Sequence, residues 1–399
     1  MILSLSLALI LSLVAGSICE KIKLPKIVGM ILTGILLGPF VLNLFDEKLL
    51  SISGELRKIA LIVILLKAGL SLDLRDLIKV GRPAILLSFL PATFEIIGYS
   101  IFAKLIFNIP LVEAALMGAV LSAVSPAVVV PRMVSLIEKK IGTDKAIPQM
   151  ILAGASMDDI FVIVLFSTFL GLSKNNSFNY MELLKIPVSI IMGIIVGVIF
   201  GILLYNIFEY RFKNSTHIRN TTKVIIILAT SFFLVSMEDL VKDYIAVSGL
   251  LAVLSMAITI RVKSPDIVVG RLSEKFGKIW IGAELILFVL VGAAVDIRFT
   301  FNSGIGVVVV IAIALIFRTL GVILSTANTG LTLQERLFCT YSYLPKATVQ
   351  AAIGTVPLSM GIASGDIILS VAVVGILLTA PIGAFLIDRT AMKVLEQSL

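Results

Sequence analysis

Long apolar runs are the feature that most limits what this chain can fold into. Each run is roughly 17 to 25 residues long, the length that an α-helix needs to cross the hydrocarbon core of a bilayer. The sequence therefore predicts an all-α polytopic membrane protein with about thirteen transmembrane helices, near residues 2–19, 27–43, 57–74, 83–106, 109–131, 148–171, 186–208, 223–237, 244–260, 279–296, 304–326, 335–360 and 367–387.

Composition and charge agree with a membrane location. Apolar residues make up 59% of the chain and charged residues only 15%, too little polar surface for a water-soluble globule of this size. Most Lys and Arg residues fall on one side when the loop with Lys21, Lys23 and Lys26 is placed in the cytoplasm. The N-terminus is then expected outside and the tail from Asp388 to Leu399 inside. The net charge of +8 thus indicates topology, and no nucleic-acid partner is expected.

The sequence also indicates an internal repeat. Asp73 closes the third apolar run and Asp296 closes the tenth, and 22 positions after each stand Glu95 and Arg318. The next run contains a proline in each half. Runs 1–6 and 8–13 therefore form two six-helix repeats, and run 7 joins them with inverted orientation.

Those two prolines, Pro126 and Pro345, predict helices that are broken within the membrane. Each proline removes a backbone hydrogen bond, and unwound backbone at this depth is tolerated beside a cavity or a protein contact. A simple kink is the alternative. The polar side chains of Ser125, Thr348 and Gln350 beside the breaks favour support of an ion site.

Several ionisable residues lie near mid-membrane, where a charge needs a partner or a water-filled cavity. A structural ion pair would explain one such residue. A cluster at one depth favours a functional site, and five residues share this depth: Glu95, Asp158, Asp159, Arg318 and Lys346.

The adjacent carboxylates Asp158 and Asp159 are the predicted ion site. On a helix they point about 100° apart. Two such close acids resist joint ionisation, and a carboxylate is a hard ligand suited to a small cation. Competition of a proton and a cation for one carboxylate is sufficient chemistry for an antiporter. The alternative is that both acids only neutralise Arg318 and Lys346.

Enzyme activity is not predicted, and neither is a cofactor. No phosphate-binding glycine loop, zinc motif or nucleophile elbow stands in a usable context, so an ATP-driven pump is unsupported. An intramembrane aspartyl protease also uses two aspartates, but these come from different helices, unlike Asp158 and Asp159.

Five segments carry a family resemblance over nearly the whole chain: VSPAVVVP, ASMDDI, LPKATVQAAIG, LLKAGLSLD and GILLGP. They resemble the cation/proton antiporter superfamily, and within it the sodium/hydrogen exchanger subfamily B. The resemblance implies exchange of Na⁺ or Li⁺ for H⁺ by elevator-like alternating access. It also implies a homodimer formed through a scaffold domain, in the cell membrane and typical of a prokaryotic inner membrane, with lipids as the other partners.

The resemblance further implies a division into a scaffold and a mobile core, with runs 5 and 12 crossing as broken helices. The scaffold (dimerisation) domain would comprise residues 1–80 and 220–298. Residues 81–171 would form the first part of the core. Residues 299–399 would form its second part with a short cytoplasmic tail, and residues 172–219 a linker helix.

The resemblance assigns roles to single residues. Asp159 matches the ion-binding carboxylate of the superfamily, and Asp158 its variable neighbour. Arg318 falls where some relatives place a lysine, and Glu95 and Lys346 match the subfamily B pattern. Glu95 and Arg318 are expected to supply a charge pair, and Glu95 and Lys346 to compensate the helix dipoles, because the first break lacks the aspartate of other branches.

Arginine cannot be deprotonated in proteins, so a permanent Glu95–Arg318 pair is predicted and electroneutral exchange is slightly favoured. Three alternatives remain open: K⁺/H⁺ exchange, a cation channel and bile-acid-like substrates on a related fold.

Overall fold

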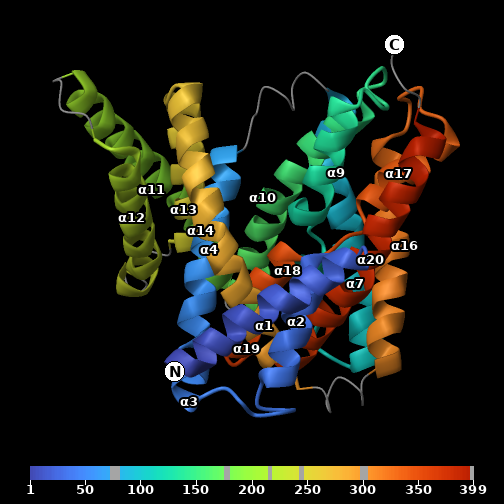
Figure 1. The fold of residues 1–399 in the computed structure, drawn as a ribbon, viewed down its shortest axis with the longest axis horizontal. Helices are drawn as coiled ribbons and strands as arrows, with labels where there is room; N and C mark the ends of the chain where they lie inside the picture. The colour runs from blue at the N-terminus through green and yellow to red at the C-terminus, as the bar shows by residue number, and fades with distance from the viewer. Residues whose placement is uncertain (72–80, 175–179, 214–217, 242–246, 297–303, 396–399) are drawn as a thin grey trace. The chain divides into compact units, whose positions relative to one another are not determined.

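The computed structural model describes residues 1–71, 81–174, 180–213, 218–241, 247–296 and 304–395, and every regular element in these ranges is helical (Figure 1). Each of the thirteen apolar runs coincides with one or more helices. Within the described residues, nine helical stretches are long and apolar enough to cross a membrane. The chain is a multi-pass membrane protein.

The described chain divides into two compact units. The first comprises Met1–Gly54, Asp73–Ser173 and Leu287–Leu399, and the second Glu55–Leu72 and Lys174–Ile286. The first unit contains both predicted core segments, together with residues 1–54, 73–80 and 287–298 of the predicted scaffold. The assignment of scaffold and core roles stays a prediction.

The second unit is built around close helix packing at small residues. Its helices are α4 (Ser53–Ser71), α11 (Tyr180–Lys213), α12 (Asn220–Val241), α13 (Gly249–Lys263) and most of α14 (Asp266–Ala293). Gly193, Gly197 and Gly201 of α11 lie against α13, and a Cβ at Gly193 would stand 2.6 Å from Ser248 O. Packing therefore explains this glycine stripe.

The first unit contains the remaining helices and, with them, the candidate site. They are α1 (Ile2–Lys21), α2 (Lys26–Leu37), α3 (Glu47–Ser51), α6 (Arg82–Leu87), α7 (Leu90–Phe107), α8 (Leu111–Leu121), α9 (Pro126–Glu138), α10 (Ile147–Lys174), α16 (Gly304–Ser325), α17 (Leu333–Ser342), α18 (Thr348–Ile353), α19 (Val356–Ser359) and α20 (Gly365–Val394).

Helices α7 and α16, which the sequence gives as equivalent in the two repeats, pack side by side. The backbones approach closely at Gly321, where a Cβ would lie 2.6 Å from Pro91 Cα. This packing brings Glu95 of α7 to Arg318 of α16. Asp73, the first marker of the repeat, lies outside the described residues.

Both predicted helix breaks are present. Helix α8 ends at Leu121 and α9 begins at Pro126, whereas α17 ends at Ser342 and α18 begins at Thr348. Pro126 occupies the start of α9 and not a helix interior, because the first turn needs no N–H donor. The Ser125 N–H donates to Pro345 O at 2.8 Å, so the two breaks lie against each other.

A further interruption separates α6 from α7 within the run predicted as one helix over 83–106. The turn at Ser88 and Phe89 precedes Pro91, which stands in the first turn of α7. Because Pro91 has no N–H to donate to Leu87 O, the α-helical ladder loses a hydrogen bond at this point, which favours the interruption.

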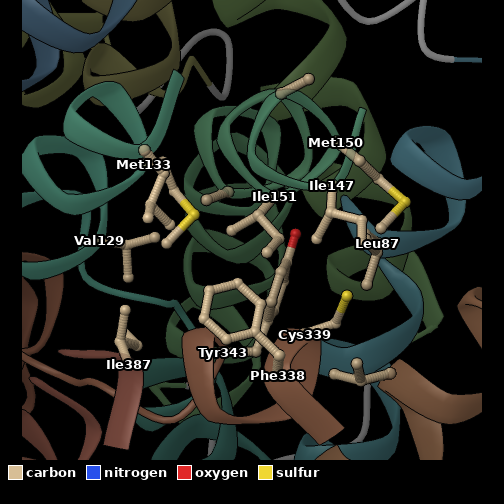
Figure 2. Close-up of a cluster of buried hydrophobic side chains, with 14 of the residues drawn as sticks. Leu87, Val129, Met133, Ile147, Met150, Ile151, Phe338, Cys339, Tyr343 and Ile387 are labelled. Carbon is tan, nitrogen blue, oxygen red and sulfur yellow. The ribbon is translucent and has the colours of Figure 1, made fainter. Parts of the chain in front are cut away.

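A buried apolar cluster packs α6, α9, α10, α17 and α20 together beside the breaks (Figure 2). Phe338, Cys339 and Tyr343 enter it from the end of α17, and all three side chains are fully buried. Cys339 acts there as a small apolar side chain. The cluster borders the charged site because Tyr343 contributes to both.

Candidate functional site

Glu95 and Arg318 form a fully buried ion pair between α7 and α16. Arg318 Nη1 lies 2.5 Å from Glu95 Oε2, and neither side chain is more than 1% exposed. Isolating either charge inside the membrane would be costly, and the pairing removes that cost. The contact predicted from the repeat is therefore present. Its permanence through a transport cycle stays a prediction.

Lys346 joins this pair from the break between α17 and α18. Its Nζ lies 2.6 Å from the same Glu95 oxygen, and its backbone N–H donates to Thr379 Oγ1 of α20 at 2.9 Å. Glu95 Oε1 has no hydrogen-bond partner among the described residues. One carboxylate thus faces two buried cations.

Arg318 also contacts the carbonyl ends of both broken helices. Its Nη1 donates to Ser122 O, just after α8, and its Nε donates to Tyr343 O, just after α17. Helix C-termini carry partial negative charge, which a cation stabilises. Glu95 and Lys346 are the residues predicted to compensate the helix dipoles, whereas the side chain that contacts both helix ends is that of Arg318.

Asp158 is held in place from two directions. Its Oδ2 accepts the Val124 N–H at 2.8 Å, from the first break, and lies 3.3 Å from Arg318 Nη2. Its Oδ1 has no hydrogen-bond partner among the described residues. Asp158 therefore belongs to the charged network and keeps one oxygen available.

Asp159 lies in a different environment although it is the next residue on α10. It is buried at 7% exposure, and its Oδ1 has no hydrogen-bond partner among the described residues. The described residues form no ion pair with Asp159, whereas Arg318 pairs with Asp158. Asp159 is thus a buried carboxylate outside the ion-pair network that the described residues form.

Gln350 ties the two breaks together. Its Oε1 accepts the Ala347 N–H at 2.7 Å, and its Nε2 donates to Ala123 O at 2.7 Å and to Leu121 O at 3.3 Å. The side-chain amide is therefore committed to backbone groups that the breaks leave unpaired. Its support of the site comes through the backbone.

Two hydroxyls beside the breaks remain available. Ser125 directly precedes Pro126, the first residue of α9, and Thr348 is the first residue of α18. Ser125 Oγ and Thr348 Oγ1 are buried, and neither has a hydrogen-bond partner among the described residues. Hydroxyl and carboxylate oxygens are the ligands that hard cations prefer.

Two contributors to the site escape sequence reasoning. Val124 acts through its backbone N–H, which leaves no trace in residue type. Tyr343 stacks its ring on Arg318, with the guanidinium carbon 5.4 Å from the ring centroid. Its place directly before the LPKAT segment is the one signal that could have found it.

Comparison with known proteins adds independent findings. The model of the family described as "Sodium/hydrogen exchanger, transmembrane" matches residues 7–393. Sodium/hydrogen exchanger 9B2 of Xenopus tropicalis is 33% identical over 403 residues, which cover 96% of this chain and 73% of that protein. The 9B2 exchanger of Homo sapiens is 30% identical over 408 residues, with 97% and 74% covered.

A solved structure shares the fold. The sodium proton antiporter MjNhaP1 from Methanocaldococcus jannaschii, at pH 8, superposes with a TM-score of 0.80 over 98% of this chain and 97% of that one. The sequence identity is 23%, so this likeness concerns the fold alone.

Proposed function

The chain belongs to the sodium/hydrogen exchanger family, and from this premise we propose that it is a secondary active antiporter that exchanges Na⁺ or Li⁺ for H⁺. One observation carries the site assignment. Asp159 is a buried carboxylate without an ion-pair partner among the described residues, next to an Asp158 that Arg318 and Val124 hold. We assign Asp159 as the group for which the proton and the cation compete.

The unpartnered oxygens around the breaks suit a small dehydrated cation. Asp159 Oδ1, Asp158 Oδ1, Ser125 Oγ and Thr348 Oγ1 are all buried and have no protein donor among the described residues. A cation that binds Asp159 displaces its proton, because one carboxylate cannot hold both. Exchange follows without any further chemical step.

The formal charges of the site support one-for-one exchange. Three carboxylates, Glu95, Asp158 and Asp159, stand with two basic groups, Arg318 and Lys346, so one negative charge is left over. Either one Na⁺ or one proton neutralises it. Both loaded states then cross the membrane with the same charge, and electroneutral exchange results.

We propose the transport movement from the same family membership. The six-helix core moves like an elevator against a scaffold through which two chains dimerise. Thirteen spans in two inverted repeats, with the N-terminus outside, complete the arrangement. The packing of α7 on α16 supports the repeat, because it brings two equivalent positions into contact. The protein would contribute to pH homeostasis at the cell membrane.

The function is tested by measuring cation-driven proton flux in proteoliposomes and comparing Na⁺, Li⁺ and K⁺. An outward cation gradient is imposed, and internal pH is followed with a fluorescent dye. Na⁺ and Li⁺ are expected to drive protons inward, and K⁺ is not. A dominant K⁺ response would establish K⁺/H⁺ exchange, and cation flux without proton movement would establish a channel.

A further inference from the structure

Tyr343 is the large polar side chain at the site that the proposed mechanism does not use. It follows α17 directly, is fully buried, and contacts Arg318 in two ways. Its carbonyl accepts the Arg318 Nε–H, and its ring lies under the guanidinium at 5.4 Å from the centroid. One residue thus fixes both an edge and a face of the planar group.

In the described part of the chain, packing and not hydrogen bonding fixes the position of the Tyr343 hydroxyl. Its Oη has no hydrogen-bond partner among the described residues, and Figure 2 shows it within the apolar cluster beside Ile151. It lies against Gly154 of α10, where an added Cβ would collide with it. A glycine at position 154 is what lets the ring reach this far.

Gly154 stands one helical turn before Asp158, which closes a path of contacts. Arg318 Nη2 lies 3.3 Å from Asp158 Oδ2, Tyr343 holds Arg318, and Tyr343 rests on the helix that carries Asp158. A rigid ring at this place sets how far Arg318 can move from Asp158, because buried side chains have little freedom to shift.

We propose that Tyr343 is a positioning residue for Arg318: it keeps the guanidinium on Asp158 and so leaves Asp159 to the proton and the cation. This inference rests on the proposed function. Without the ring, Arg318 keeps its contacts with Glu95 and Asp158 but loses the contact on the face of its guanidinium. It can then shift toward Asp159 and compete with the cation. The alternative is a purely structural role, in which Tyr343 only fills the apolar cluster.

Two substitutions at position 343 separate these roles. Tyr343→Phe keeps the ring and is expected to retain the Na⁺ KM and the pH profile of exchange. Tyr343→Leu removes the cation–π contact and is expected to raise the Na⁺ KM about tenfold and to shift the pH of half-maximal rate. Phe338→Leu is the matched control, since it removes a buried ring from the same cluster, and Phe338 forms no cation–π contact with the charged residues in the described part of the chain.

Position 154 provides an independent test. Gly154→Ala is expected to displace the Tyr343 ring and to raise the Na⁺ KM. Adding Tyr343→Phe removes the colliding hydroxyl, so the double variant is expected to recover part of the loss. Both variants keep the second close contact of the new Cβ, with Leu87 Cβ at 2.8 Å, so their difference reports the hydroxyl alone.

The outcomes are distinct from those of the proposed function. Absence of Na⁺-driven proton movement in the unmodified protein would overturn the function itself. With that movement present, a Tyr343→Leu variant that behaves like Phe338→Leu in KM and pH profile would overturn the positioning role. A Gly154→Ala variant that Tyr343→Phe does not rescue would do the same, even if Tyr343→Leu fails to fold.

Discussion

Lys346 Nζ lies 2.6 Å from Glu95 Oε2, although the two residues stand 251 positions apart in the chain. The same oxygen accepts from Arg318 Nη1. Removal of the Glu95 charge therefore leaves two buried cations facing each other. Removal of the Arg318 charge still leaves Glu95 a partner.

Glu95→Gln and Arg318→Gln are each expected to lower thermal stability more than they alter apparent Na⁺ affinity. Leaving one partner of a buried pair alone typically costs about 3 to 5 kcal/mol, and the loss is expected to be smaller for Arg318→Gln because Lys346 still faces Glu95. The double variant is expected to recover part of the loss, because no charged guanidinium then faces a neutral residue 95, although Lys346 still does. Melting of the purified variants measures this, and strictly additive losses would contradict the pairing.

Asp159→Asn is expected to abolish cation-driven proton movement in a protein that remains folded. The amide keeps the shape of the carboxylate but cannot exchange a proton. Dye-based flux in proteoliposomes tests this, with the melting temperature as the control for folding. Substantial Na⁺/H⁺ exchange in this variant would remove Asp159 as the carrier.

Asp158→Asn is expected to be milder and to shift the pH profile of exchange. The amide oxygen can still accept the Val124 N–H, so the first break stays anchored. The lost negative charge changes the electrostatic environment of the neighbouring Asp159. Initial exchange rates between pH 5.5 and pH 8.5, a range of about three units around neutrality, give the profile. A profile identical to that of the unmodified protein would count against coupling.

Gln350→Leu is expected to lower stability by about 1 to 3 kcal/mol for each buried backbone group left unpaired. Ala123 O and the Ala347 N–H both lose a partner at 2.7 Å. Gln350→Glu keeps the acceptor and loses the donor, so it separates the two bonds. Equal melting temperatures for the unmodified and Leu variants would show that Gln350 does not hold the breaks.

Charge movement during exchange is expected to be absent in steady state. The site carries one unbalanced negative charge, which one Na⁺ or one proton neutralises. Recording on a solid-supported membrane measures this directly. A sustained Na⁺-evoked charge displacement that follows turnover would mean that Asp158 or Lys346 carries a second proton.

The sequence predicts the larger features of this molecule because they follow from solvent and covalent geometry. Long apolar runs locate the helices, and Pro126 and Pro345 indicate the breaks, since each proline removes a hydrogen bond of the helical ladder. The repeat spacing brings Glu95 and Arg318 together without a structure. Shared family motifs select Asp159 from its neighbour.

Finer features depend on three-dimensional packing. That Arg318 contacts the ends of both α8 and α17 depends on where two chain segments cross, which no local pattern encodes. The interruption before Pro91 is not among the predicted breaks, although Pro91 is the same kind of signal as Pro126 and Pro345. Gln350 is predicted to support the ion site, but the sequence does not show that its amide binds backbone groups of both breaks.

The Ser125–Pro345 hydrogen bond has a consequence for how the protein is made. The donor, the Ser125 N–H, is synthesised 220 residues before the acceptor, Pro345 O. The bilayer core offers no water as a substitute partner in the meantime. The carbonyls of Leu121 and Ala123 likewise gain their Gln350 donor only after this later segment has been synthesised. The first six helices can therefore insert during translation, but their broken helix cannot reach its final form until the twelfth apolar run has entered the bilayer, and the two halves mature as one.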